Sequence, residues 1–429
     1  MSFQQGLSGL NAASKNLDSL GNNIANASTV GFKSSQTQFS DVFANSLAGA
    51  GGIQVGIGTQ ISTITQQFTQ GNITGTNNPL DIAISGQGFF RLSNQGSTVY
   101  SRNGQFQQDK QGFLVNAAGA NLTGRPAING VISGGALSNL QIPTNNLSPQ
   151  VTSSIGVGVN LDSRSPVVAT AAFNPTDPTS YTQSTSLTLY DALGGEQSVG
   201  LYFAKTSNNN WNVYGTLTNP SGATTVLNYT PAVVGPPAVP ASTAPLGALA
   251  FSASTGALTS STVTLPTLTT AQLGTGAANL ASIPASSFVF SGSTQFGTLY
   301  GINQLTQNGF TSGRPTGFNI GRDGIITGRY SNGQTLLLGQ VELSNFRNPN
   351  GLEPLGNNVW AESSDSGQPL PGTPGSGSLG VLQSSAVEDS NVDLTKELVD
   401  MITAQRSYQA NAQTIKTQDQ VLQTLVNLR

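Results

Sequence analysis

The amino-acid sequence predicts a mainly β fold with α-helical termini, in which nested, discontinuous β domains are carried on a coiled-coil-like pair of terminal helices. Two observations favour this fold. Apolar residues recur every three or four positions at both ends of the chain, which is the spacing of helices that pack side by side with a slight supercoil. The stretch between the ends is rich in glycine and in short β-like runs. We therefore expect the two termini to lie together.

The first helix is expected to begin at residues 2–5, where Ser-Phe-Gln-Gln fits a capping box, and to end at a run of asparagines before Gly31. At about 1.5 Å per residue, this helix is about 35 Å long. That is too long for it to fold back onto one small core. Its stripe is interrupted by a serine and a glycine and consists of Phe3, Leu7, Leu10, Ser14, Leu17, Gly21 and Ile24.

Short β-forming runs separated by turn residues make up the middle of the chain. The pair Asn103-Gly104 is typical of a two-residue hairpin turn. A Pro- and Ala-rich stretch at 231–245 predicts a surface loop, and a Gly- and Pro-rich stretch at 367–380 predicts a linker. Strands are expected at residues 71–75, 80–84, 86–92, 99–102, 113–115, 186–190, 199–204, 211–217, 318–326 and 335–343.

The order helix, β, β, β, helix predicts nested domains. We expect residues 146–305 to form an outer β domain, inserted between two halves of an inner β domain, 71–145 and 306–384. Residues 1–70 and 385–429 are expected to form a terminal helical assembly domain. The chain must then enter and leave the insert at neighbouring points, so the insert should be removable.

The last helix is expected to start after residues 390–393, which fit an N-terminal cap. It should be about 55 Å long at the same rise per residue. Polar residues interrupt its stripe, so each terminal helix should be marginal alone. The stripe consists of Leu394, Leu398, Met401, Gln405, Tyr408, Ala412, Ile415, Asp419, Leu422 and Val426. Two arms of this kind indicate an assembly protein.

Charged residues make up 8% of the chain, against about 25% in ordinary globular proteins. Low charge density means weak repulsion between closely packed copies, which suits a polymer. With 16 Lys and Arg residues and a net charge of -3, the sequence has no basic patch for nucleic acid. Histidine and cysteine are absent, which excludes the familiar nucleophilic triads, the usual zinc ligands and disulfides. We therefore expect no enzyme, no cofactor and no metal.

No run of 18 apolar residues is present, so we expect no membrane insertion. The first residues also lack the basic and continuous apolar regions of a signal peptide. The absence of cysteine is compatible with an exported protein that must stay free of disulfides in transit.

Motifs at both ends of the chain resemble one known family. Residues 22–33, Asn-Asn-Ile-Ala-Asn-Ala-Ser-Thr-Val-Gly-Phe-Lys, resemble the signature of the bacterial flagellar axial proteins, which form the rod, the hook and the hook-filament junction. Residues 391–429 resemble the C-terminal helix that these proteins share. The resemblance covers nearly the whole chain.

Motifs in the middle of the chain indicate which branch of this family the sequence resembles. Residues 68–73 and 80–90 resemble a stretch shared by rod and hook proteins. Residues 189–194, which read Leu-Tyr-Asp-Ala-Leu-Gly, are similar to the outer domain of flagellar hook proteins, as are residues 202–205 and Asn210-Trp211.

The resemblance implies a structural subunit of the hook, which polymerises into a curved, flexible tube that transmits torque from the rod to the filament. It implies export through the flagellum's own type III apparatus without a cleaved signal peptide, and a location outside the cell in a hook attached to the basal body. The implied partners are further copies of the chain, the distal rod protein, the hook cap protein, the hook-filament junction protein and the export apparatus.

The resemblance also implies that the terminal helices form an inner tube. By default, the asparagines of the first motif are helix-stop residues, and they can serve as a recognition corner as well. The expected assembly interface consists of Phe3, Leu7, Leu10, Leu17, Asn22, Asn23, Ile24, Asn26, Thr29, Gly31, Phe32, Leu394, Leu398, Met401, Tyr408, Ile415, Leu422 and Val426.

Three alternatives stay open at this point. A distal rod protein of the same family has a shorter body, with no room for residues 146–305. A secreted β-rich adhesin fits the Ser- and Thr-rich middle but leaves the terminal stripes unexplained. A hydrolase in the outer domain is disfavoured by the missing histidine. The glycine pattern at 375–380 matches a dinucleotide motif, but it follows a Pro-rich stretch rather than a strand and is better explained as a linker.

Overall fold

The computed structural model divides the chain into two compact units. The first comprises residues 1–144, 316–329 and 335–429, and the second comprises residues 145–315 and 330–334. The surface loop expected at 231–245 lies outside the described residues, apart from its last two positions. The described residues are 2–42, 56–168, 173–218, 222, 224–227, 244–268, 283 and 286–427.

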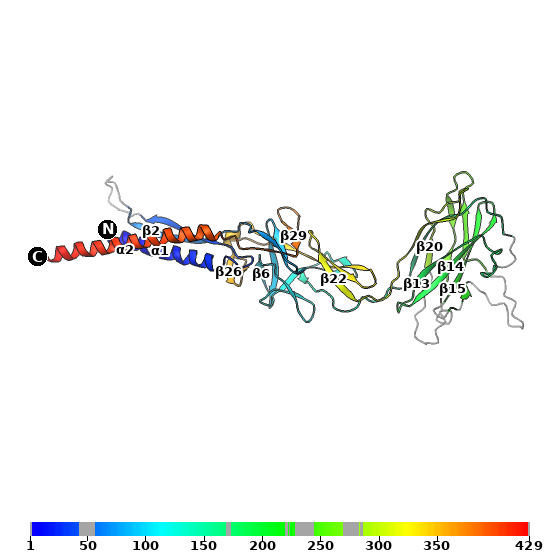
Figure 1. Cartoon of the computed structure of the whole chain (residues 1–429), viewed down its shortest axis with the longest axis horizontal. Helices are drawn as coiled ribbons and strands as arrows, with labels where there is room; N and C mark the ends of the chain where they lie inside the picture. Colours follow the sequence, from blue (N-terminus) through cyan, green and yellow to red (C-terminus); the bar gives the residue numbers. More distant parts are fainter. Residues whose placement is uncertain are drawn as a thin grey trace. The chain divides into compact units, whose positions relative to one another are not determined.

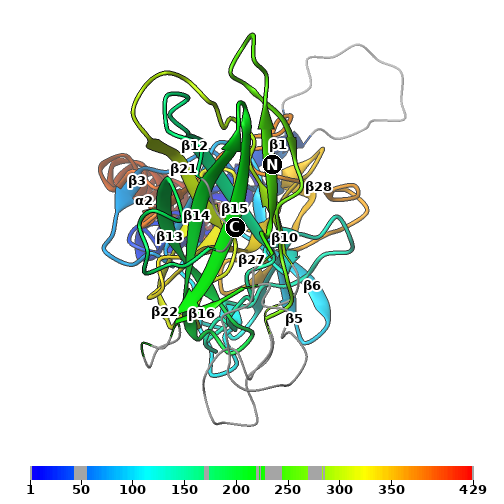
Figure 2. The ribbon, with the colours of Figure 1, turned by 90° about the vertical axis from the view of Figure 1, so that its right-hand side faces the viewer.

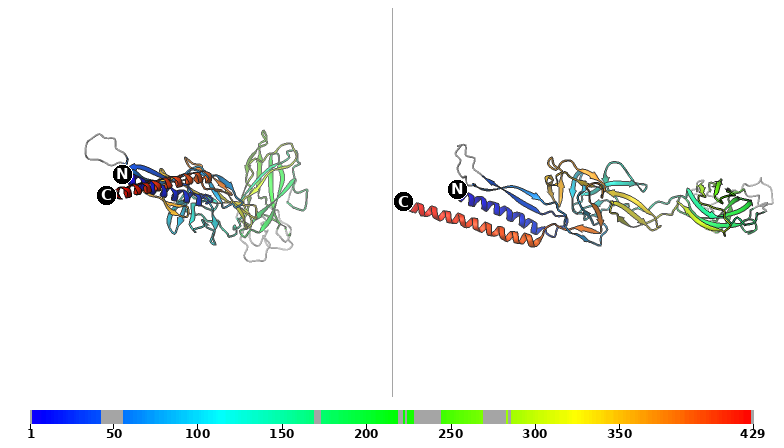
Figure 3. Two further views of the ribbon diagram at one scale, coloured as in Figure 1. Left: turned by 60° about the vertical axis from the view of Figure 1, so that its left-hand side comes forward. Right: turned by 90° about the horizontal axis from the view of Figure 1, so that it is seen from above.

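Two antiparallel helices, α1 (Ser2–Ala25) and α2 (Leu394–Asn427), lie at the ends of the described chain. They run side by side, with the two chain termini together (Figure 1). Gly9 allows the close approach, because a Cβ atom at this position would lie 2.8 Å from the side chain of Asn411. Gly6 faces Ile415, so the end of α2 runs past the start of α1 (Figure 3). The prediction of a mainly β fold with helical termini is confirmed.

An antiparallel hairpin, β1 (Ser35–Val42) and β2 (Gly58–Gln66), packs beside α1. The expectation of a helical domain over residues 1–70 is wrong for this hairpin. Threonine and isoleucine recur along β2, and β-branched residues favour extended backbone over helix. The hairpin leaves two isoleucines and a phenylalanine exposed, Phe39, Ile61 and Ile64.

The β body is the part of the first unit formed by strands β3 to β11 and β22 to β30. These strands are β3 (Ile73–Gly75), β4 (Ile82–Ser85), β5 (Phe89–Asn94), β6 (Ser97–Ser101), β7 (Gln107–Gln108), β8 (Leu114–Val115), β9 (Asn121–Ile128), β10 (Val131–Ile132), β11 (Ser138–Asn139), β22 (Pro315–Ile320), β23 (Ile325–Tyr330), β24 (Thr335–Val341), β25 (Leu343–Asn345), β26 (Glu353–Gly356), β27 (Val359–Ala361), β28 (Leu370–Gly372), β29 (Val381–Ser384) and β30 (Ala386–Glu388), with a short 3-10 helix, η1 (Pro349–Gly351).

Early and late parts of the sequence pair throughout the β body. The main sheet has the order β22-β23-β24-β9-β5-β6-β27-β26, while β29 pairs with β4 and β30 pairs with β3. Apolar side chains from both parts, such as Leu92, Leu122 and Val341, fill one core. The expected linker at 367–380 is wrong in one respect, because it contains β28, which pairs with β25. A three-residue strand between Gly- and Pro-rich turns carries too little pattern to be recognised.

The second unit packs two sheets on one apolar core. Their orders are β19-β20-β12-β21 and β13-β14-β15-β17-β18, with β16 also on β15. Figure 2 shows β13, β14 and β15 side by side. Fully buried Trp211 occupies the core and donates a hydrogen bond from Nε1 to Gln295 Oε1 (3.0 Å). The strands are β12 (Ser154–Asn160), β13 (Gln183–Tyr190), β14 (Glu196–Ser207), β15 (Asn210–Thr218), β16 (Thr224–Val226), β17 (Gly247–Phe251), β18 (Leu258–Ser261), β19 (Thr264–Leu265), β20 (Ser286–Val289) and β21 (Gly301–Gln307).

The expected boundary of the insert at residue 305 falls inside β21. This strand pairs with β12 along most of its length, so the second unit keeps the chain up to Pro315. Isolated bridges join Leu147 to Gly313 and Gln150 to Phe310. The chain segments that enter and leave the unit therefore run next to each other.

Candidate assembly site

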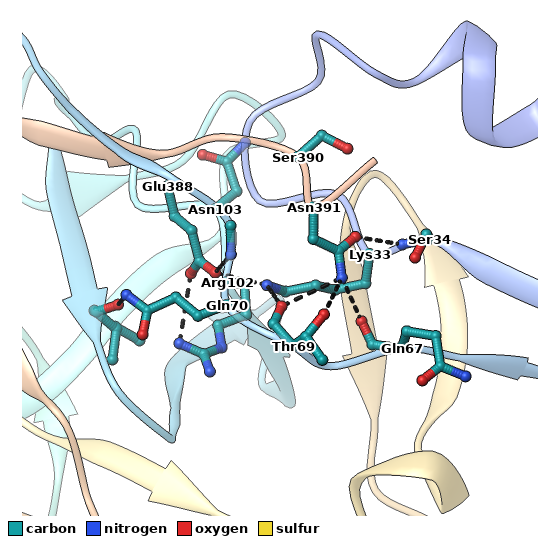
Figure 4. A network of polar contacts seen from close by, with 12 residues as sticks. Lys33, Ser34, Gln67, Thr69, Gln70, Arg102, Asn103, Glu388, Ser390 and Asn391 are labelled. Carbon is teal, nitrogen blue, oxygen red and sulfur yellow. Dashed lines mark hydrogen bonds and ion pairs between the residues drawn. The ribbon is translucent and has the colours of Figure 1, made fainter. Parts of the chain in front are cut away.

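Three chain segments meet at one buried ionic cluster: the turn from α1 to β1, the connection from β2 into the β body, and the connection from the β body to α2 (Figure 4). Lys33 Nζ lies 2.6 Å from Glu388 Oε1, and Arg102 Nη1 lies 3.5 Å from Glu388 Oε2. All three side chains are almost completely buried. Burial lowers the pKa of the Lys33 ammonium, and the Glu388 carboxylate opposes that shift. We call these three residues the junction triad.

Asn391 ties the same connections together from just beyond β30. Its Nδ2 donates to the carbonyl of Gln67 (2.7 Å) and to Thr69 Oγ1 (2.8 Å), and its Oδ1 accepts from the amide of Ser34 (2.7 Å). Lys33 Nζ also donates to the carbonyl of Thr69 (2.7 Å). Side-chain hydrogen bonds therefore join three segments to one another: the segment after α1, the segment after β2 and the segment before α2 (Figure 4).

The motif at 22–33 builds the turn that ends α1. Gly31 adopts φ of +71°, and its amide donates to the carbonyl of Glu388 (2.7 Å). A Cβ atom at Gly31 would lie 2.6 Å from the backbone nitrogen of Asn103, so glycine is required there. Asn26 Nδ2 donates to the carbonyl of Asn22, and Thr29 Oγ1 contacts Asn26 Oδ1.

Asn23 is the buried asparagine of this motif. Its Nδ2 donates to the carbonyl of Ser35 (2.9 Å) and to Glu397 Oε2 (3.2 Å), while its Oδ1 accepts from the Ser35 amide (2.8 Å). One side chain thus joins α1, β1 and α2. Asn22, its neighbour, is exposed.

Asn23→Ala is expected to destabilise this end of the helix pair by about 1–3 kcal/mol, because it removes hydrogen bonds from partly buried groups of Ser35 and Glu397, of which the Ser35 carbonyl keeps a bond from Ser19 Oγ (3.2 Å). Urea unfolding followed by helical circular dichroism measures the loss. Asn22→Ala is the matched control, since an exposed asparagine one position earlier should change stability by less than about 0.5 kcal/mol. Equal stability of the two variants would contradict the assigned role of Asn23.

The structure separates the expected interface residues by burial. Those exposed in the single chain are Phe3, Leu7, Asn22, Leu394, Leu398, Tyr408 and Leu422. Those partly buried are Leu10, Leu17, Ile24, Asn26, Thr29, Phe32, Met401 and Ile415, and those buried are Asn23 and Gly31. The side chain of Val426 lies outside the described residues.

Small residues of α1 contribute to the contact between α1 and α2, where they meet a member of the predicted stripe, Ile415. Gly6 and Gly9 face Ile415 and Asn411, and the other buried residues of the pair include Ala12, Ala13, Leu20 and Ala404. Much of the large apolar stripe therefore remains free in one chain. Sequence reasoning missed Val399 and Ile402, which are also exposed and directly adjoin the stripe.

A groove of about 640 Å³ lies between α1, the hairpin and α2. Its lining combines small and apolar side chains such as Ala12, Ala13 and Phe39 with charged groups of α2, among them Glu397 and Asp400. Within the described residues, no cluster of three His, Cys, Asp or Glu side chains forms a potential metal site. Among the same residues, no helix is long and apolar enough to cross a membrane.

Four family models match successive parts of the chain. They are the flagella basal body rod protein model at residues 3–33, the flagellar hook protein FlgE/F/G D1 domain at 83–157, the flagellar basal body protein FlaE D2 domain at 160–310 and the flagellar basal body rod FlgEFG protein C-terminal model at 383–428. These matches cover both terminal helices and both units.

Curated relatives match along the full length. Flagellar hook protein FlgE of Escherichia coli strain K12 is 42% identical over 442 aligned residues, and the alignment covers 100% of both chains. The protein of the same name from Salmonella typhimurium strain LT2 is 43% identical over 436 residues, again with 100% of both chains covered. Among solved structures, the Helicobacter pylori flagellar hook protein FlgE2 has a similar fold, with a TM-score of 0.53 and 14% identity, covering 73% of this chain and 100% of that one.

Proposed function

This chain belongs to the flagellar hook protein family and is a structural subunit of the bacterial flagellar hook, and we propose that it polymerises through apolar side chains that its terminal helices leave exposed. One observation carries the proposal. The two helices pack on each other through small residues such as Gly6 and Gly9. Leucines such as Leu7, Leu398 and Leu422 remain exposed. Burying apolar surface contributes about 25 cal/mol per Å², so packing against neighbouring copies is favourable.

Low charge supports the same proposal. The exposed apolar residues of α2 are interspersed with threonine and glutamine, and the three basic residues of this helix balance its three acidic ones, while the whole chain carries 8% charged residues. Neighbouring copies can thus approach closely with little repulsion. In the curved, flexible tube that we propose, polar contacts between the β parts of neighbouring subunits can slide because each contributes only about 1 kcal/mol. The terminal helices keep their register and transmit torque.

Membership of the hook family supports further assignments of partners and activity. We infer that the tube contacts the distal rod protein at its base, and the hook cap protein and then the hook-filament junction protein at its tip. We infer further that the chain acts as no enzyme, which the absence of histidine and cysteine supports. The hook lies outside the cell, attached to the basal body.

We also propose that the chain is exported through the flagellar type III apparatus without cleavage. The first residues of α1 belong to the helix that packs on α2, which supports their retention in the mature subunit. Intact-mass measurement of subunits from isolated hooks tests it. A mass that lacks the first residues of α1 would contradict it.

Electron microscopy and sedimentation of the purified chain test the assembly proposal. We expect tubes above a critical concentration and monomers below it. A fragment that lacks α1 and α2 should remain monomeric at every concentration tested. Tubes from that fragment, or monomers of the full chain under all assembly conditions, would contradict assembly through the helices.

A further inference from the structure

We propose that Glu388 is a positioning residue that latches the terminal helices to the β body, so that rotation of the helices is passed to the body. This inference rests on the proposed function in a rotating tube. The triad brings together Lys33 from the turn between α1 and β1, Arg102 from the position directly after β6, and Glu388 from the last position of β30. The two covalent connections between the helix-hairpin part and the β body, after β2 and before α2, both pass beside it, as does the turn from α1 to β1.

Backbone groups join the latch to all three connections. The amide of Gly71 donates to Glu388 Oε1 (3.0 Å), and the amide of Gly31 donates to the Glu388 carbonyl (2.7 Å). Next to Glu388, the amide of Asp389 donates to the carbonyl of Asn72 (2.8 Å). Displacement of Glu388 would therefore loosen the segments that follow α1 and β2 together.

Arg102 is the fixed side of the latch. Its Nη2 donates to the carbonyl of Gly86 (2.9 Å), and its guanidinium lies 5.4 Å from the ring centroid of Phe89. Phe89 in turn packs edge-on against Phe346 and Trp360. The guanidinium thus belongs to the β body, while Lys33 lies in the turn from α1 to β1 and Glu388 lies where the chain leaves the β body for α2.

The charges of the junction triad indicate that it positions these segments and does not merely fill the core. Two buried cations share one carboxylate, and the Arg102 Nε is without a hydrogen-bond partner among the described residues. Buried ion pairs seldom add net stability over apolar side chains, but their geometry can fix one arrangement of the groups. Removal of Glu388 leaves two uncompensated cations, whereas removal of Lys33 leaves the neutral pair of Arg102 and Glu388.

Three variants of the full chain test the latch in assembled tubes: Glu388→Gln, Lys33→Met, and Glu342→Gln as the matched control. Glu342 is also buried and paired with an arginine, Arg125, but lies within the β body. Amide exchange at Gly31, Gly71 and Asp389 reports opening of the latch. Electron microscopy reports whether the β layer stays in register with the inner helices.

We expect Glu388→Gln to raise exchange at these amides by roughly 100-fold, the equivalent of an uncompensated buried charge. Its tubes should keep an ordered inner layer and show a blurred β layer. Lys33→Met should give a smaller rise in exchange, and Glu342→Gln should match the wild type. Wild-type exchange in both triad variants, or an equal rise in the control, would overturn the latch.

Two further outcomes are decided by the same measurements. If Glu388→Gln forms no tubes, tubes of Lys33→Met decide: faster exchange and a blurred β layer support the latch, while wild-type behaviour or a second failure to assemble overturns it. If the wild-type chain forms no tubes, the assembly proposal fails. The latch is then judged on soluble chains, where faster exchange in Glu388→Gln than in Glu342→Gln supports it and equal exchange overturns it.

Discussion

Leu398→Asp is expected to abolish tube formation while both units of the chain remain folded, and Leu422→Asp should do the same. These side chains are 46% and 54% exposed in the single chain, so an aspartate costs the monomer little. In a tube that buries them, the same carboxylate loses its hydration without a partner, at a cost of several kcal/mol. Sedimentation and electron microscopy measure assembly, and near-ultraviolet circular dichroism of the two tryptophans checks the fold.

Gln413→Asp is the matched control, because Gln413 is an exposed polar residue of the same helix. It should leave assembly intact. Ile415→Asp is expected to behave differently from both leucine variants. Ile415 contacts α1 at Gly6, so its replacement should weaken the helix pair as well as the tube. Normal tubes from Leu398→Asp and Leu422→Asp would show that the interface lies elsewhere.

The terminal helices were predictable because their apolar residues recur with helical spacing over many turns. The sequence did not reveal which face meets which partner. The stripe of large residues suggested the contact between α1 and α2. Gly6 and Gly9 also take part in it, and only a close approach of the two helices distinguishes such glycines from weak points in a helix.

The hairpin and the junction triad were missed for a different reason. The hairpin packs one face on α1, and its strands are largely polar, so little alternation marks them. Arg102 and Glu388 are 286 positions apart. Local pattern carries no information about such a pairing. Lys33 itself was a usable hint, because a cation within a motif of an otherwise weakly charged chain indicates a specific role.

Nested domains were predictable from element order, but their boundaries depend on pairing between distant strands. The sequence places residues 306–315 in the same inner β domain as the residues that follow them. The structure assigns them to the second unit because β21 pairs with β12 and the bridges at Leu147 and Gln150 continue that contact. The division of labour between the units can therefore be tested at a boundary that leaves these pairings whole.

Deletion of residues 145–315, with Thr144 joined to Thr316 by a short Gly/Ser linker, is expected to leave a first unit that folds and still polymerises. The entering and leaving segments run next to each other through the Leu147–Gly313 bridge, so a short linker can close the gap. The β body keeps its own apolar core, and the exposed stripe on α1 and α2 is unchanged. We expect tubes of lower mass per unit length.

Curvature should change most in these tubes, because the deleted unit supplies the polar contacts that we propose slide between neighbouring subunits. Electron microscopy measures the curvature of the tubes, and scanning transmission electron microscopy measures their mass per unit length. The isolated second unit is the control: it retains its own core and lacks both helices, so it should fold and stay monomeric. A soluble, folded deletion variant that forms no tubes would place essential lattice contacts in the second unit. Tubes with wild-type curvature would instead place the control of bending in the first unit.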